Sequence, residues 1–300
     1  MQSLKIYIQN PKQFLASVLQ KVGLWIPDKW YLQMFYYLNT GKPLNLKNPL
    51  TFSEKLQWLK LYNRKPEYTM MVDKYAVKEY VAGIIGKDHI IPTLGVWDRP
   101  EDINFDDLPQ QFVLKTTHGG GSGGVIVCVD KTQLNKESVI KSLQQALKGD
   151  IYKAFREWPY KDVKRRIIAE QYIGKSHEDL KDYKFFCFNG EPKYCQVISG
   201  RHDVMSIDFF DTEWNHQPFH EPKQFPFSKQ KVDPPLSLTK MLNFSQLLST
   251  NIPFIRVDFY EVNGLPYFGE LTFFPTSGVG GFDPKEWDGV FGEMISLPLQ

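Results

Sequence analysis

The sequence predicts an α+β protein of two lobes with a helical extension at its N-terminal end. Apolar residues recur at helical spacing along the first fifty residues, and short strand-like runs separated by glycine-rich or acidic loops begin near residue 90 and again near residue 166. The length of 300 residues also exceeds one typical compact domain. We therefore expect an extension at 1–50, a first lobe at 51–165 and a second lobe at 166–300.

The first part of the chain is predicted to be helical. Residues 14–22 and 30–40 carry apolar side chains at helical spacing, and the second run ends at Thr40-Gly41. Thr51 and Glu54 have the spacing of a capping box, which predicts that a helix begins there. A third helix is predicted at 70–81.

Strands dominate the rest of the chain. The first lobe is predicted to hold three strands and then a helix at 138–148. The second lobe is predicted to hold four strands, a proline-rich loop at 216–236, a helix at 236–250 and a hairpin. The predicted single strands lie at 90–97, 111–117, 124–130, 165–173, 183–190, 192–200 and 206–214.

Composition excludes several classes of protein. The 36 basic and 34 acidic residues leave a formal charge of +2, which provides no global field for nucleic acid. Cys128, Cys187 and Cys195 form no CxxC pair, so neither a disulfide framework nor a zinc site is indicated. We find no membrane-spanning run and no signal-peptide pattern at the start, and we therefore expect a soluble, cytoplasmic, unprocessed protein.

The predicted hairpin at 254–272 carries the strongest functional signal. Side chains alternate along a strand, so Arg256 and Asp258 share one face. Asn263-Gly264 is a tight-turn signal that brings Glu270 back to the level of Asp258. Two carboxylates suit Mg²⁺, and an arginine beside them can bind a phosphate. The alternative is a cross-strand salt bridge on a solvated surface.

A glycine-rich loop lies between two predicted strands. Residues 118–124 read HGGGSGG, and such a loop can turn its backbone N–H groups onto phosphate oxygens. The Walker pattern is missing and a strand follows, so we expect the loop to cover phosphates from above. The alternative is a flexible hairpin turn. Lys115, at the end of the preceding apolar strand, would be expected to meet an anion.

Three further residues are candidate ligands, and each also has a simple structural explanation. Lys74 stands near a predicted helix start, where it could also be a solvated surface lysine. Glu170 ends an apolar strand, where it could hold an adenosine or merely be a polar strand terminus. Lys184 begins the next strand and could point into the same cleft.

The order of these motifs and their amino-acid sequences resemble the ATP-grasp superfamily, and most closely its TupA-like branch. The resemblance covers roughly residues 45–290 and rests on five segments in order: LQWLKLYNRKPEYTMMVDKYAVKEYV, FVLKTTHGGGSGG, IIAEQYI, DYKFFCFNGEPKY and RVDFYEVNGLPYFGELTFFPTSG. It implies an ATP-grasp fold in which ATP and Mg²⁺ bind in a cleft between two α+β lobes.

The resemblance also implies roles for individual residues. Arg256 and Lys115 would neutralise the transferring phosphoryl group. From their place on the predicted lid, His118 and Ser122 are further catalytic candidates that could orient the acceptor, with a merely exposed position as the alternative. Many ATP-grasp proteins have asparagine where this chain has Thr272, so the number of magnesium ions is open. The implied phosphate ligands are Lys74, Lys115 and the loop residues Gly119, Gly120, Gly121, Ser122, Gly123 and Gly124; the other implied nucleotide ligands are Glu170, Tyr172 and Lys184; and the implied metal ligands are Asp258, Glu270 and Thr272.

The resemblance implies an ATP-dependent ligase. It would form an amide through an acyl phosphate, with an amine and the sugar acid of a bacterial cell-surface polysaccharide precursor as substrates. Two alternatives stay open: a glycosyltransferase that uses Asp208 and Asp211 as a metal site, and a non-catalytic ATP-binding module. Asp208 and Asp211 are expected to face opposite sides of a strand, which argues against the first. Residues 1–45 are expected to pack on the lobes or to touch the inner face of a membrane.

Overall fold

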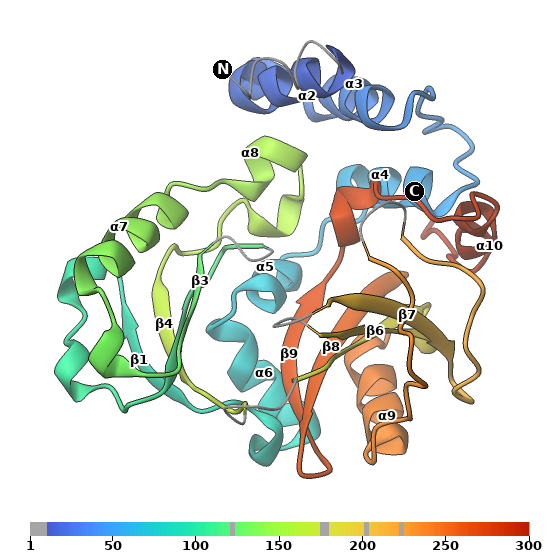
Figure 1. Cartoon of the computed structure of the whole chain (residues 1–300). Coiled ribbons are helices and arrows are strands. Elements are labelled where there is room, and N and C mark those ends of the chain that lie inside the picture. The colour runs from blue at the N-terminus through green and yellow to red at the C-terminus, as the bar shows by residue number, and fades with distance from the viewer. Residues whose placement is uncertain (1–10, 121–123, 175–179, 201–203, 222–224, 300) are drawn as a thin grey trace.

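The computed structural model describes residues 11–120, 124–174, 180–200, 204–221 and 225–299. Within these ranges the predicted α+β architecture is confirmed: two antiparallel sheets form, and the helices at the N-terminal end lie above them (Figure 1). The helices are α2 (Pro11–Val22), α3 (Asp28–Thr40), α4 (Phe52–Tyr62), α5 (Glu67–Val72), α6 (Ala76–Ile85), α7 (Lys136–Leu147), α8 (Ile151–Phe155), α9 (Leu238–Ser249) and α10 (Trp287–Glu293).

The smaller sheet has the strand order β1-β4-β2-β3 among the described residues. Its strands are β1 (Thr93–Trp97), β2 (Phe112–Thr116), β3 (Val125–Cys128) and β4 (Ile167–Gln171). Helix α7 covers one face, where Val139 and Leu143 pack with Phe112 and Leu114. The predicted domain boundaries stay predictions, but β4, which they assign to the second lobe, pairs with β1 and β2.

The larger sheet has the order β7-β6-β5-β8-β9 within the described part of the chain. Its strands are β5 (Asp182–Phe188), β6 (Glu191–Ser199), β7 (Ser206–Asp211), β8 (Phe254–Val262) and β9 (Leu265–Thr272). Helix α9 packs on one face, and α5 and α6 lie between the two sheets (Figure 1). The largest hydrophobic core surrounds this sheet and is rich in phenylalanine, which brings a large apolar area into a small volume.

Two local predictions are confirmed and one is wrong. Thr51 and Glu54 form the predicted capping box at α4. Asn263 and Gly264 have φ values of 53° and 73°, the conformation that a tight hairpin turn requires. The helix predicted at 70–81 is instead two helices, because the Asp73 carboxylate accepts hydrogen bonds from the backbone N–H groups of Tyr75 and Ala76 and so caps a new helix.

The N-terminal helices are partly packed and partly exposed. Tyr31, Phe35 and Tyr36 are buried in a small core that includes Leu19 and borders Phe155 of α8. The aromatic residues between and beside the helices are not covered to the same degree: Trp25 is 93% exposed and Trp30 is 62% exposed. In the described residues, no helix combines the length and apolar character that crossing a membrane requires.

A fully buried lysine joins distant segments. The Lys60 ammonium donates to Gln57 Oε1 at 3.1 Å and to the carbonyl oxygens of Phe155 at 3.0 Å and Ser277 at 2.9 Å. Burial lowers the pKa of Lys60 to about 8, although Glu157 acts in the opposite direction. Ser277 has a φ of 53° and donates its hydroxyl to Glu157, so this network holds a strained turn directly after β9.

Replacing this lysine is expected to destabilise the fold. Lys60→Met removes three hydrogen bonds and leaves Glu157 and two carbonyl groups without their cation, which should cost about 3–5 kcal/mol of unfolding free energy. Urea denaturation followed by circular dichroism measures the loss. Lys240→Met, at an exposed position of α9, is the control and should change the free energy by less than about 0.5 kcal/mol. Equal stability of the two variants would contradict a structural role for Lys60.

Candidate functional site

A polar row crosses the face of the larger sheet that lies opposite α9. Glu270 of β9 pairs with Asp258 of β8, Asp258 pairs with Lys184 of β5, and Lys184 pairs with Gln196 of β6. Directly paired residues of neighbouring strands project from the same face, so these four side chains form one line. The predicted positions of Asp258 and Glu270 opposite each other are therefore confirmed.

Arg256 binds the two carboxylates of the hairpin. Its Nε and Nη2 atoms donate to the two oxygens of Asp258, each at 2.7 Å. Nη2 also donates to Glu270 Oε1 at 3.3 Å and to Thr272 Oγ1 at 3.1 Å. Burial alone would lower the pKa of Arg256, but Asp258 and Glu270 outweigh it and raise the pKa, so the guanidinium stays charged.

Two lysines complete the cluster from different elements. Lys184 forms an ion pair with Asp258 on the neighbouring strand and lies 3.9 Å from Asp182. Lys74 reaches Glu270 Oε2 at 2.5 Å from the turn between α5 and α6. Burial raises the pKa of Glu270, but Lys74, Lys184 and Arg256 together hold it well below its usual range. Lys74 is therefore not a solvated surface lysine.

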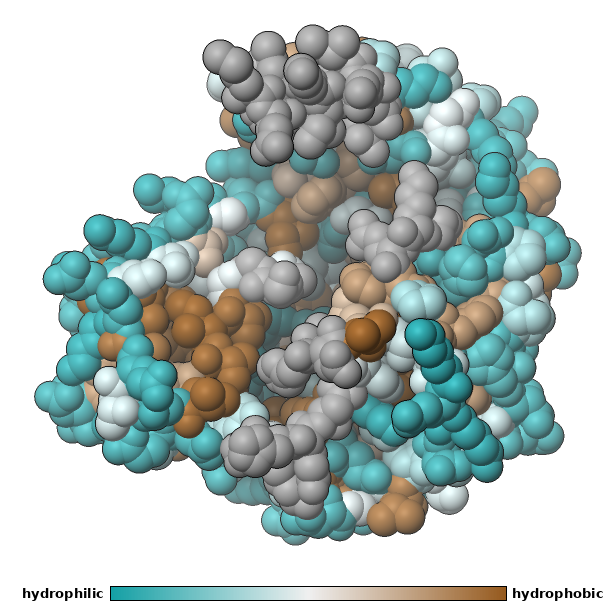
Figure 2. All heavy atoms as spheres, viewed as in Figure 1, coloured by the Kyte–Doolittle hydropathy of each residue, from teal (hydrophilic) through white to brown (hydrophobic). Residues whose placement is uncertain are grey.

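The turn that carries Lys74 is fixed to the smaller sheet. The backbone N–H of Lys74 donates to Thr117 O at 3.0 Å, and the carboxylate of the adjacent Asp73 accepts from Arg166 at 2.8 Å. Because the Lys74 ammonium pairs with Glu270, this one turn links the end of β2 to the hairpin of the other sheet. The surface is recessed between the two sheets (Figure 2).

A second charged cluster lies on the smaller sheet. Glu170 is buried, and its two oxygens accept from Lys78 at 2.7 Å and Lys115 at 2.5 Å. Burial raises the pKa of Glu170, but the two lysines outweigh it and lower the pKa. The prediction that Lys115 meets an anion is confirmed, although its partner in this structure is Glu170. Lys78 was missed by the sequence analysis; its spacing of four residues from Lys74 is the signal that could have indicated it.

Apolar side chains flank Glu170 on the same face. Val113 is directly paired with Glu170 on one side and with Val127 on the other. Val127 is 50% exposed although it lies in a strand, and apolar residues gather on this lobe where it faces the recess (Figure 2). An apolar sheet surface beside a buried carboxylate and two lysines suits a planar base joined to a charged group. Neither valine is indicated by the sequence alone.

The glycine-rich loop connects β2 and β3, as predicted. His118, Gly119, Gly120 and Gly124 are described, whereas Gly121, Ser122 and Gly123 lie outside the described residues, so the roles predicted for those three stay predictions. His118 is only 4% exposed, and neither of its ring nitrogens has a hydrogen bond of ordinary geometry among the described residues. Burial, and then Arg165, lower its pKa.

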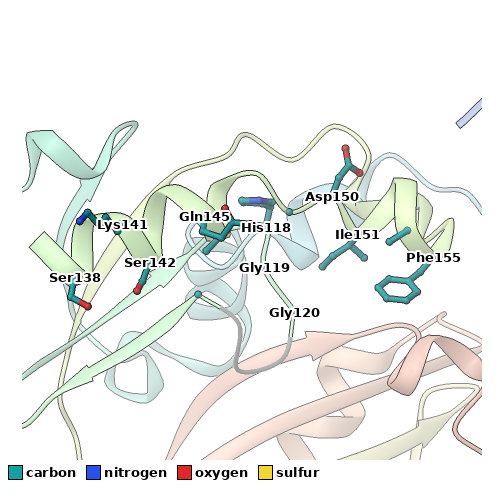
Figure 3. A pocket seen from close by; sticks show the side chains of 14 residues that line it. His118, Gly119, Gly120, Ser138, Lys141, Ser142, Gln145, Asp150, Ile151 and Phe155 are labelled. Atoms are coloured by element: carbon teal, nitrogen blue, oxygen red, sulfur yellow. The ribbon is translucent and has the colours of Figure 1, made fainter. Parts of the chain in front are cut away.

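His118 faces an open cavity on the helical side of its lobe. The cavity has a volume of about 680 Å³ and lies between the loop and the helices α7 and α8 (Figure 3). Gln145 of α7 and Asp150 before α8 lie near the histidine ring. The predicted role of His118 in orienting an acceptor stays a prediction. The same holds for Tyr172, which is half-buried one residue beyond β4.

The hairpin has the donor set that magnesium prefers. Asp258 and Glu270 supply carboxylate oxygens and Thr272 supplies a hydroxyl, all facing the cluster of Arg256. Mg²⁺ usually takes one or two protein carboxylates and fills its octahedron with water and phosphate oxygens. In the described part of the chain no group of three or more His, Cys, Asp or Glu residues could hold a metal by itself. The two carboxylates and the hydroxyl fit a magnesium ion that binds together with phosphate oxygens.

Two antiparallel sheets that carry facing clusters of lysine, arginine and carboxylate are the features of an ATP-grasp protein. The family model described as TupA-like ATPgrasp matches residues 54–296 of this chain. The chain therefore belongs to the TupA-like ATP-grasp family. This confirms the resemblance of the five sequence segments. The comparison with curated proteins found no match.

Several solved ligase structures are distantly similar. The D-alanine–D-alanine ligase of Bacillus anthracis with ATP is 18% identical over 68% of this chain and 54% of its own, with a TM-score of 0.38. The corresponding enzyme of Helicobacter pylori is 16% identical over 81% and 69%, with a TM-score of 0.43. The L-amino acid ligase of Bacillus licheniformis is 15% identical over 77% and 52%, with a TM-score of 0.41. The chain thus spans about half the length of the first and third of these structures.

Acid is expected to weaken the Glu170 cluster. The folded-state pKa of Glu170 is lowered, so its ionised form contributes stability above about pH 4.5 and this contribution is lost as the pH falls further. Glu170→Gln should therefore reduce the unfolding free energy most at pH 6, and the difference from the wild type should shrink towards pH 3. Urea denaturation at several pH values measures this. Glu213→Gln, on an exposed loop, is the control, and a difference for Glu170→Gln that is constant with pH would contradict the assignment.

Proposed function

We propose that this protein is an ATP-dependent ligase that joins a carboxylate to an amine and uses Mg²⁺. The observation that carries the proposal is the cluster of Arg256, Lys184 and Lys74 around the carboxylates of Asp258 and Glu270, at the edge of a recess whose other side carries Lys115 and Glu170. Membership of the ATP-grasp family supports it.

The proposed reaction has two steps. A carboxylate oxygen of the substrate attacks the γ-phosphorus of ATP, the bond to the β-phosphate oxygen breaks, and ADP leaves. An amine then attacks the acyl carbon, the carbon–oxygen bond to phosphate breaks, and an amide and inorganic phosphate form. No nucleophile from the protein is required. Arg256, Lys184 and Lys74 neutralise the charge on the phosphoryl group, which is the main demand of phosphoryl transfer.

The nucleotide and the metal are assigned to opposite sides of the recess. Val113 and Val127 offer an apolar surface to the base, and Glu170, Lys78 and Lys115 lie beside it. Asp258 and Glu270, with Thr272 as a weaker oxygen ligand, would hold Mg²⁺, which supplies Lewis-acid neutralisation of phosphate oxygens when bound. The glycine loop is expected to exclude water from the acyl phosphate.

The substrate class follows from the TupA-like resemblance alone. We propose that the carboxylate belongs to a sugar acid of a bacterial cell-surface polysaccharide precursor and that the amine belongs to an amino acid or a related amino compound. Such a precursor is made in the cytoplasm or at the inner face of the membrane, so we place the protein there. The family match supports the assignment to the TupA-like branch. The identity of the acceptor is part of this proposal.

The glycosyltransferase alternative lacks a metal site at Asp208 and Asp211. Asp208 accepts hydrogen bonds from His216 Nε2 at 2.9 Å and from the backbone N–H of Ser228. The Asp211 carboxylate instead accepts hydrogen bonds from the backbone and side-chain N–H groups of Asn215. The two carboxylates therefore bind separate partners. A competition assay separates the two activities: ATP is expected to displace a bound fluorescent adenine nucleotide, whereas UDP-sugars are expected to leave it bound.

Removing the hairpin carboxylates should abolish turnover. Asp258→Asn and Glu270→Gln are each expected to lower ADP release in the presence of MgATP, a uronic acid and an amino acid by at least about 100-fold, because the charge that organises metal and phosphate is lost. Circular dichroism checks the fold of each variant. Asp233→Asn, in an exposed ion pair with Lys231, is the matched control and should retain full rate. Full activity of Glu270→Gln would support the non-catalytic alternative instead.

The exposed tryptophans allow a test of membrane contact. Trp25 and Trp30 are largely exposed, and Lys21 and Lys29 lie close to them in the chain. We propose that this surface binds anionic lipid. The full chain should pellet with vesicles that contain phosphatidylglycerol, and the double variant Trp25→Ser/Trp30→Ser should lose most of that binding. Equal pelleting of both proteins, or none with the wild type, would contradict a membrane contact through these tryptophans.

A further inference from the structure

The polar row on the larger sheet extends one strand beyond the residues that the proposed phosphoryl transfer uses. Gln196 on β6 is the direct partner of Lys184 on β5, on the side away from Asp258 and Glu270. It is 2% exposed, and its Nε2 atom has no hydrogen bond of ordinary geometry among the described residues. A buried amide without a well-formed hydrogen bond costs free energy, which a ligand group that accepts from it would offset.

The carboxylate of Glu221 lies close to Gln196. Glu221 follows the loop after β7 and is held there because the backbone of His220 pairs with Asp283. Its carboxylate interacts with Gln196, Arg256 and Lys184. Glu221 also lines a small cavity together with Phe186, which is the cross-strand partner of Arg256. Gln196 and Glu221 therefore both border the cluster of Arg256 and Lys184.

We propose that Gln196 and Glu221 form the binding site for the amine substrate, and that Glu221 accepts a proton from its ammonium group. This inference rests on the proposed function. The amine nitrogen bonds to the acyl carbon, the carbon–oxygen bond to phosphate breaks, one ammonium proton passes to Glu221 and a second leaves with the phosphate. The side-chain oxygen of Gln196 accepts a hydrogen bond from the ammonium and its Nε2 donates to the rest of the substrate.

The electrostatics of Glu221 suit both tasks. Burial raises its pKa, although Arg256, Gln196 and Lys184 act in the opposite direction. A carboxylate with a raised pKa is a stronger base than an ordinary one, which suits a group that takes a proton from an ammonium. The neighbouring Lys184 and Arg256 each form an ion pair with Asp258. Glu221 is therefore the carboxylate that interacts with Gln196.

The test separates the two steps of the reaction. Hydroxylamine is neutral at neutral pH and traps acyl phosphates as hydroxamates without prior loss of a proton, whereas an amino acid must lose one. The wild type is assayed with MgATP and a panel of uronic acids, once with hydroxylamine and once with a panel of amino acids. Glu221→Gln is expected to lower amide formation by about 100-fold and hydroxamate formation by less than about tenfold. Gln196→Leu should raise the KM for the amino acid with little change in kcat.

Two controls make the outcomes distinguishable. Glu213→Gln, an exposed glutamate in the same β7-to-α9 connection, should behave as the wild type in both assays. Equal losses in the two assays for Glu221→Gln, or no loss in either, would overturn the assignment of the amine site while the ligase activity of the wild type stands. A wild type that forms neither hydroxamate nor amide would overturn the proposed function, and the amine site with it.

Discussion

The pairing of β8 with β9, whose register shifts by one residue between Asp258 and Phe259, is the constraint on which the site depends. It sets Asp258 opposite Glu270, and the two oxygens of Asp258 and one of Glu270 then accept from a single guanidinium, that of Arg256. Without this one-residue shift, Glu270 would lie opposite Val257 on the core face, where Leu271 and Phe268 are buried. The turn at Asn263-Gly264 sets the pairing as far as Phe259, and the shift beyond it keeps both Phe268 and Leu271 in the core, so packing on one face fixes chemistry on the other.

The local parts of this arrangement could be predicted from the sequence. Alternation along 254–260 and a turn with Asn-Gly are short-range signals, and they place Arg256 and Asp258 on one face and return the chain beside them. The exact position of Glu270 opposite Asp258 depends in addition on the register shift beside Asp258. The capping box at Thr51 is equally local. The break at Asp73 was not predicted, because the apolar pattern of 70–81 continues across it and only a hydrogen bond from one carboxylate divides the helix.

The rest of the site depends on contacts between segments far apart in the sequence. Gln196 becomes part of the polar row only because β6 lies beside β5, and Glu221 reaches it only because His220 pairs with Asp283. Lys60 is similar: in sequence it is a lysine on an amphipathic helix, and its burial depends on Phe155 and Ser277. Such roles are properties of the tertiary structure, and periodicity or propensity does not contain them.

The ion pairs of the hairpin favour a particular order of events in the proposed reaction, in which metal and nucleotide bind together. Glu270 pairs with both Lys74 and Arg256, and Asp258 pairs with both Arg256 and Lys184. A magnesium ion that arrived alone would have to displace these cations and leave them without an anion, which is costly in a partly buried site. Phosphate oxygens that arrive with the metal offer the displaced lysines and arginine new partners. The exchange of partners then keeps every charge compensated, and in the proposed reaction the same cations would hold the transferring phosphoryl group.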